Sequence, residues 1–178
     1  MSATFRGDGF KSTTLTAKSR LNLGGYPGAP TTRTEMVKAV TGFADTVAKD
    51  VFTVTVPNAT HAAMIDVEVL GVMGAGGAVG AGETVRASKY QIAVVRRAGL
   101  AAVIGVSSAI GGATAAVAGA SALTSVVVTA SSVTGANGAT QTFTIKVAIT
   151  KTAGSGDNHT AVAKATVVNQ NASGVTIA

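Results

Sequence analysis

A long stretch without charge limits the folds open to this chain more than any other feature. Between Ala98 and Ile145 there is no Asp, Glu, Lys, Arg or His, and Ala, Val, Gly, Ser, Thr and Ile make up most of the segment. Charged side chains normally cover much of the surface of a soluble domain, so such a segment requires a bilayer, a protein interior or a surface covered by other subunits. The pattern of residues within the segment decides among these three environments.

The segment lacks the pattern of a membrane-spanning helix. A spanning helix needs about 20 mainly apolar residues, whereas Gly, Ser and Thr interrupt the apolar residues here every few positions. Val103–Val106 and Val126–Ala130 are short runs rich in β-branched residues, which favour strands. Gly111 and Gly112 would weaken a helix further. We therefore predict several strands, covered on both faces by partners, and no association with a membrane.

The overall charge also predicts that the chain hides surface in an assembly. Only 12 % of its 178 residues are charged, against about a quarter in an average soluble domain, and the net charge is +6. Cysteine is absent, which excludes disulfides and thiolate metal sites. The beginning of the chain is polar, basic and rich in glycine, without the apolar core of a signal peptide, so we expect folding in a cytoplasm.

Residues 1–34 are predicted to form an extended basic N-terminal arm. Glycines and prolines prevent long helices there, although residues 14–23 alternate loosely enough to pair as a strand. Nucleic acid is disfavoured as a partner, because no cluster of aromatic side chains accompanies the charge. The basic residues that we expect to contact an acidic protein surface are Arg6, Lys11, Lys18, Arg20 and Arg33.

Residues 35–178 are predicted to form one antiparallel β-sandwich domain, jelly-roll-like or immunoglobulin-like. Alternating apolar and polar side chains indicate strands. The predicted strands are 51–56, 62–73, 86–97, 100–109, 123–133, 143–149, 161–169 and 175–177. Short strands at regular spacing with turn-rich connections are typical of β-sandwiches. The fold class is therefore all-β, with the extended arm preceding the sandwich.

Two glycine-rich segments are predicted to be connectors rather than ligand sites. Gly74–Gly82 contains part of a dinucleotide fingerprint, but Val79 occupies the third glycine position and the next residues return to a strand pattern. Gly111–Gly119 is likewise predicted to be a loop between two strands. Residues 35–49 fit either a helix or a strand, and the strand is favoured because Gly42 weakens a helix.

The two histidines do not indicate a metal or catalytic site. His61 and His159 are the only histidines, and each stands beside Asn and Thr residues in a predicted loop. A metal site or an activated nucleophile would need several polar partners, and Asp157 is the sole carboxylate nearby. We therefore predict that both histidines are solvated.

Two carboxylates are the remaining candidates for catalysis. Asp66 and Glu68 are expected on the outward face of a strand, two residues apart, as paired acids of a glycosidase could be. Lys89 and Arg96 in a neighbouring strand offer a simpler explanation, which is cross-strand ion pairing. We therefore predict no enzymatic activity and no catalytic, cofactor-binding or metal-binding residues.

The succession of strands resembles a class of virus proteins. After the arm come Asp50–Pro57, Met64–Gly71, Lys89–Val95 and a Thr/Gly-rich strand pair that ends in Phe143–Ile149. Together they resemble small β-sandwich structural proteins of tailed-bacteriophage virions, which include capsid decoration (cement) proteins, head fibres and tail-fibre domains. The resemblance is one of pattern and composition, and it covers residues 35–178.

This resemblance implies a structural role in a virion. Cement proteins bind the outer surface of the phage head, usually as trimers, and staple neighbouring capsid subunits together. By this resemblance we expect a homotrimer that is made in the host cytoplasm and binds the major capsid protein through the basic arm, with no cofactor and no nucleic acid. The alternative is a head-fibre or tail-fibre/adaptor protein with a role in host recognition.

Overall fold

The computed structural model describes residues 21–22, 32–44, 46–74, 82–116, 123–151, 159–170 and 174–178. Within this part of the chain every regular element is a β-strand, and no helix is long and apolar enough to cross a membrane. The strands are β1 (Leu21–Asn22), β2 (Thr32–Phe43), β3 (Lys49–Val56), β4 (His61–Gly74), β5 (Gly82–Arg96), β6 (Val103–Val106), β7 (Gly111–Ala116), β8 (Leu123–Ala130), β9 (Gln141–Lys151), β10 (His159–Asn169) and β11 (Thr176–Ile177).

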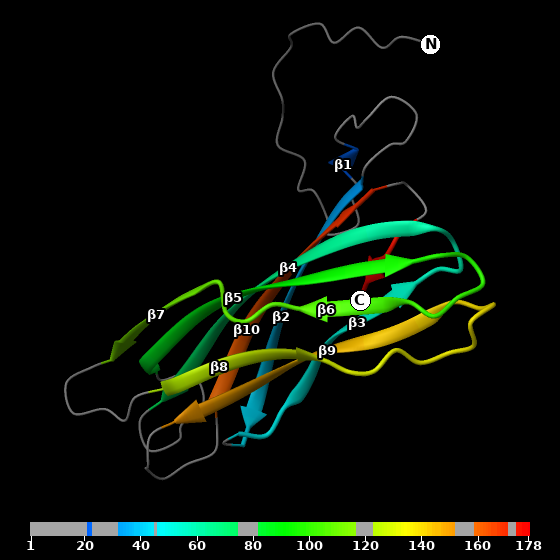
Figure 1. Cartoon of the computed structure of the whole chain (residues 1–178). Helices are drawn as coiled ribbons and strands as arrows, with labels where there is room; N and C mark the ends of the chain where they lie inside the picture. Colours follow the sequence, from blue (N-terminus) through cyan, green and yellow to red (C-terminus); the bar gives the residue numbers. More distant parts are fainter. Residues whose placement is uncertain are drawn as a thin grey trace, which may run out of the picture.

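The strands form two antiparallel sheets that pack against each other (Figure 1). The larger sheet has the order β1-β2-β10-β4-β5, and both β6 and β7 pair with the far edge of β5. The smaller sheet has the order β11-β3-β9-β8. The prediction of a single antiparallel β-sandwich is therefore confirmed.

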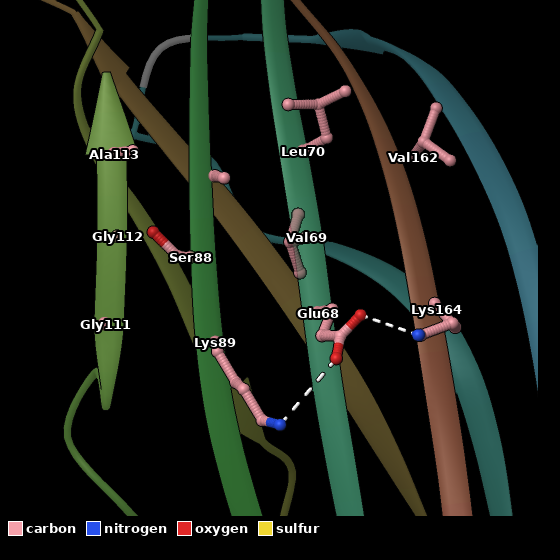
Figure 2. A pocket seen from close by; sticks show the side chains of 11 residues that line it. Glu68, Val69, Leu70, Ser88, Lys89, Gly111, Gly112, Ala113, Val162 and Lys164 are labelled. Carbon is pink, nitrogen blue, oxygen red and sulfur yellow. Dashed lines mark ion pairs between the residues drawn. The ribbon is translucent and has the colours of Figure 1, made fainter.

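Each long strand of the larger sheet has one buried and one outward face. In β4, Ile65, Val67 and Val69 are buried, whereas Asp66 and Glu68 are partly exposed, as their alternation predicts. Figure 2 looks onto the outward face, where the side chain of Glu68 reaches its neighbours. This face is the only part of the described sheet surface that carries a row of ion pairs, described below.

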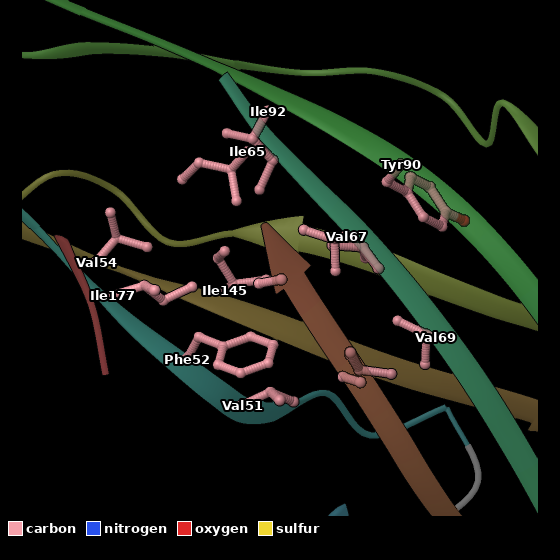
Figure 3. Packing of buried hydrophobic residues seen from close by; sticks show 14 of the residues in the cluster. Val51, Phe52, Val54, Ile65, Val67, Val69, Tyr90, Ile92, Ile145 and Ile177 are labelled. Carbon is pink, nitrogen blue, oxygen red and sulfur yellow. The ribbon is translucent and has the colours of Figure 1, made fainter. Parts of the chain in front are cut away.

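The hydrophobic core fills the space between the two sheets (Figure 3). Phe52 and Val54 of β3 and Ile145 of β9 face Ile65 and Val67 of β4, and all five side chains are at most 1 % exposed. Burial of a side chain of this size stabilises a fold by about 1.5–3 kcal/mol. Along β9 every second side chain from Gln141 to Ile149 is buried, and those of Phe143, Ile145, Val147 and Ile149 belong to the core.

Two segments that the sequence left ambiguous or assigned to a loop are strands. Residues 35–43 belong to β2, in agreement with the favoured strand prediction. Gly111–Ala116, predicted to be a loop, is strand β7, and that prediction was wrong. Main-chain pairing with β5 holds β7 in place, and a Cβ atom on Gly112 would lie 2.8 Å from the carbonyl oxygen of Ala87. Low strand propensity is thus outweighed by a close main-chain contact.

The charge-free segment is divided between the core and the surface. Val126 and Val128 of β8 and Phe143 and Ile145 of β9 are buried against the larger sheet of the same chain, so no partner is needed to cover their inner faces. In contrast, all residues of β7 and most of β6 are exposed. The expectation that partners cover both faces of every charge-free strand is therefore wrong for β8 and β9.

A buried arginine closes one end of the sandwich. The Nε of Arg96 donates to the carbonyl oxygen of Leu100 at 3.0 Å, and Nη1 donates to that of Val56 at 2.8 Å. Its Nη2 donates to the carbonyl oxygens of Asn137 and Ala139, both at 2.7 Å. The side chain is 2 % exposed, so the predicted ion pair with a surface carboxylate is wrong for this residue. Arg96 instead joins the ends of both sheets to two loops.

Candidate interaction surface

A row of three charges crosses the centre of the larger sheet's outer face (Figure 2). The antiparallel register places Lys164 of β10 opposite Glu68 of β4, and Glu68 opposite Lys89 of β5. The Nζ of Lys164 lies 2.7 Å from Oε2 of Glu68, and the Nζ of Lys89 lies 3.7 Å from Oε1. The predicted ion pair between Glu68 and Lys89 is confirmed, and Lys164 provides a second, closer partner.

These contacts shift the pKa values of two of the three groups. The hydrogen bond from Lys164 is the main cause that lowers the pKa of Glu68, and the charges of Lys164 and Lys89 lower it further. The same hydrogen bond and the charge of Glu68 raise the pKa of Lys164. Each shift favours the ionised form, so Glu68 and Lys164 remain charged across the neutral pH range.

Replacing Lys164 with methionine is expected to raise the pKa of Glu68 toward the ordinary glutamate value of about 4.3. The substitution removes the nearer ammonium group, whereas Lys89→Met removes the more distant one and should raise the pKa less. A carbon-detected NMR titration of the Glu68 carboxyl group in the two variants measures both changes. A larger rise in Lys89→Met than in Lys164→Met would contradict this order of contributions.

An open groove of about 520 Å³ lies beside the charged row. Leu70 of β4, Ala87 of β5, Ala113 of β7 and Val162 of β10 give it apolar walls, with the charged row at one end (Figure 2). On the side of β7 the groove is lined only by small residues, Gly111, Gly112 and Ala113. Its shape and apolar lining suit a side chain or strand of another protein, because burial of apolar surface drives such contacts.

The two outward carboxylates are held by separate partners. Gln91 Nε2 donates to Asp66 Oδ1 at 2.9 Å, while Glu68 binds the two lysines. A general acid in a glycosidase needs a raised pKa, whereas the pKa of Glu68 is lowered. In the part of the chain that the structure describes, no group of three or more His, Cys, Asp or Glu side chains could hold a metal ion.

Both histidines are buried, so the prediction that they are solvated in loops was wrong. His61 begins β4 and is 3 % exposed, and His159 begins β10 and is 0 % exposed. Strand alternation explains the difference, since His61 has the same parity as the buried Ile65. Burial lowers the pKa of His61, and the charge of its cross-strand neighbour Arg96 lowers it further.

Burial of neutral His61 is expected to make the fold less stable in acid. Its pKa in the folded chain lies below the unfolded value of about 6.5, so the unfolded chain binds more protons at pH values under about 6.5. The contribution of neutral His61 to the free energy of unfolding is complete above that pH. It is lost as the pH falls through the lowered pKa of His61 in the folded chain. Urea unfolding at a series of pH values measures the free energy of unfolding in the wild type and in His61→Gln.

The comparison with His61→Gln isolates this residue from the other titrating groups. The free energy of unfolding should fall less steeply below about pH 6.5 in the variant than in the wild type, because the variant has no imidazole at position 61 to protonate. Parallel pH profiles for the two proteins would show that His61 does not titrate differently on folding.

The structure describes one of the five arm residues that were predicted to bind a partner. Arg33 lies in β2, half exposed, with its Nη2 3.8 Å from Oε2 of Glu35. The other four lie outside the described residues: Arg6, Lys11, Lys18 and Arg20. The role of the arm in binding therefore stays a prediction.

Lys164 and the groove are the features of this surface that the sequence did not reveal. Because side chains alternate along a strand, Lys164 points away from the face on which Ala163 and Ala165 are buried, and alternation alone assigns it to the outward face. The ion pair between Lys164 and Glu68 forms because β10 lies between β2 and β4 in the larger sheet. In the sequence β10 lies instead between β9 and β11, which belong to the smaller sheet. Nothing in the local pattern indicates that insertion.

The sandwich is similar to part of a phage protein of known structure. With the tailspike protein of Acinetobacter baumannii phage AM24 it shares a TM-score of 0.51 and 13 % sequence identity, over 82 % of this chain and 28 % of that chain. With the tailspike protein of Acinetobacter phage vB_ApiP_P1 the TM-score is 0.32 at 16 % identity, over 97 % of this chain and 26 % of that chain. No protein-family model and no curated protein matches the sequence. The chain spans about a quarter of the length of the two tailspike proteins. The first similarity shows that the chain shares a fold with part of the AM24 tailspike protein.

Proposed function

We propose that the chain is a structural component of a tailed-phage virion, in a head fibre or in a tail fibre or its adaptor, with a role in host recognition. The observation that carries this proposal is the similarity of the sandwich, over 82 % of the chain, to part of a phage tailspike protein. The resemblance of the strand pattern to phage virion proteins supports the same class. The chain corresponds to about a quarter of that tailspike, so a domain or subunit of a larger fibre fits its size.

Capsid decoration is less well supported than the fibre role. It rests on the resemblance in sequence pattern alone, whereas the fibre role has in addition the shared fold with a tailspike protein. The basic arm, which would contact the capsid, lies mostly outside the described residues. A virion location is common to the two roles, and the position on the particle distinguishes them.

The proposed role is one of binding and assembly, without catalysis. Asp66 and Glu68 are each bound by a side chain of another strand, and the lowered pKa of Glu68 keeps it ionised. The outer face of the larger sheet offers an open apolar groove of about 520 Å³ instead. A surface of this kind suits contacts with another protein.

Immunogold electron microscopy of the virions that carry this chain tests the proposal. Antibodies raised against the purified full chain are applied to intact particles. Gold particles on the tail tip or on fibres are expected. Gold spread over the head surface would overturn the fibre role in favour of capsid decoration, and intact virions without label would overturn a place in the exposed virion altogether. Particles of an unrelated phage serve as the control for non-specific label.

A further inference from the structure

The three strands on one lateral side of the sandwich contain no charged residue. Strands β6 and β7 form the edge of the larger sheet, and β8 forms the edge of the smaller sheet (Figure 1). The two edges lie on the same side, because β8 packs beneath β5, where Tyr90 Oη donates to the carbonyl oxygen of Val126 at 2.8 Å. All three strands belong to the charge-free stretch. We call the surface formed by β6, β7 and β8 the uncharged side.

Strand β7 is exposed on both of its faces. Every residue from Gly111 to Ala116 is exposed, so neither the groove side nor the inner side of this strand is covered by the described chain. It is held by its main-chain ladder to β5, and no described strand pairs with its other edge. A strand with so little side-chain packing is marginally stable by itself. Its outer edge offers unpaired N–H and C=O groups for another strand.

The uncharged side lacks the features that normally protect a sheet edge. Natural edge strands carry charged side chains or proline, which prevent pairing with other chains. Here both are absent from β6, β7 and β8. Instead, large apolar side chains stand beside the edges, with Val103 62 % exposed, Ile110 53 % and Val127 38 %. Such an edge favours strand addition, because main-chain hydrogen bonds and apolar burial act together.

The charge distribution indicates what the uncharged side binds. The chain carries a net charge of +6, so two copies repel each other wherever charged surfaces meet. Near the opposite edge of the larger sheet, β2 carries Arg33, Glu35 and Lys38. An acidic partner would gain attraction at basic surfaces and none at the uncharged side. A second copy of the chain gains most there, because β6, β7 and β8 bring no charged side chain of their own into the contact. The cation that reaches this edge is Arg86 of β5, whose Nη1 donates to Oγ1 of Thr114 at 2.9 Å.

We infer that the uncharged side is the contact surface between copies of this chain, formed by pairing of the β6–β7 edge with a sheet edge of the next copy. Small side chains along β7, which are only Gly, Ala and Thr, allow the neighbouring main chain to approach closely. The contact covers the exposed faces of β7 and the apolar side chains beside it. This inference does not depend on the proposed function, since it concerns how copies associate and not where they act.

The mass of the protein in solution tests the inference with a matched pair of variants. Val103→Lys/Ala115→Lys places two charges on the β6–β7 edge, and Val37→Lys/Val47→Lys places the same number at exposed sites away from it. Light scattering after size-exclusion chromatography should give a multiple of 17.4 kDa for the full-length wild type and for the second variant. The first variant should give 17.4 kDa, with an unchanged circular dichroism spectrum. A monomeric wild type, or equal masses for the two variants, would overturn the inference.

Hydrogen exchange in the wild type provides a test that needs no substitution. The amides of residues 103–116 should exchange at least several-fold more slowly at about 100 µM protein than at about 1 µM, because association protects the edge by mass action. The amides of β2, near the opposite edge of the larger sheet, should exchange equally at both concentrations. Concentration-independent exchange at residues 103–116 would show that the β6–β7 edge does not lie in a contact between copies, even if the first variant fails to fold.

Discussion

Replacing Arg96 with methionine is expected to lower the free energy of unfolding by about 3–5 kcal/mol. The guanidinium is 2 % exposed and donates four hydrogen bonds to carbonyl oxygens from three segments. Methionine fills a similar volume but donates none, so the buried carbonyl of Val56 loses its partner and the loop at Asn137 and Ala139 is released. Urea unfolding followed by circular dichroism measures the loss.

Two control variants distinguish the effect of the Arg96 hydrogen bonds on stability from the effect of its charge and from that of removing a nearby arginine. Arg96→Lys keeps the charge but cannot donate in the fork geometry that reaches several carbonyls, so it should recover less than half of the stability. Arg97→Met changes the neighbouring arginine, which is exposed, and should alter stability by less than about 0.5 kcal/mol. If Arg96→Lys were as stable as the wild type, the charge and not the network of donors would be the stabilising feature.

Replacing Phe52 with alanine is expected to lower the free energy of unfolding by about 3–5 kcal/mol. Phe52 is 1 % exposed and packs in the core, on the smaller sheet, where Ile145 and Ile65 are fully buried (Figure 3). The substitution leaves a cavity that the rigid strands around it cannot fill. It also removes the ring that lies 5.8 Å below the ammonium group of Lys38. Chemical denaturation measures the change.

The neighbouring residue on the same strand provides the control for this prediction. Thr53 points outward and is exposed, so Thr53→Ala should cost less than about 1 kcal/mol, mainly through lower strand propensity. Both variants shorten one side chain at the same level of β3. Equal losses in the two variants would mean that β3 contributes through its main chain alone and that the core does not depend on Phe52.

Alternation of side chains made most of the fold predictable. The pattern in Phe143 to Ile149 predicted β9, and the same rule predicted the inward and outward faces of β4. Applied without exception, the rule also assigns His61 and Arg96 to inward faces, where the structure has them. The sequence instead predicted a loop at His61 and an ion pair between Arg96 and a surface carboxylate. The carbonyl oxygens that bind Arg96 come from loops whose proximity is a property of the folded chain.

Other features depend on contacts between distant segments and have no local signal. A register shift between Asp50 and Phe52 allows both Val51 and Phe52 to be buried, which strict alternation does not allow. Strand β7 is set by its ladder with β5, since its own residues favour neither strand nor burial. On the outer face, the pair of Glu68 and Lys89 was predictable because β4 and β5 are adjacent in sequence. Lys164 joins it only through the insertion of β10.

That insertion has a consequence for how the chain folds during its synthesis. Strand β10 occupies the centre of the larger sheet, between β2 and β4, yet it is made after β9. Until His159–Asn169 leaves the ribosome, β2 and the β4–β5 hairpin cannot join, and two strand edges that are interior in the finished sheet remain unpaired. Pairing across such a separation in sequence is slow, and exposed edges promote misassembly while it is pending. We therefore expect nascent chains that end before β10 to require a chaperone, and the sandwich to close in a single late step.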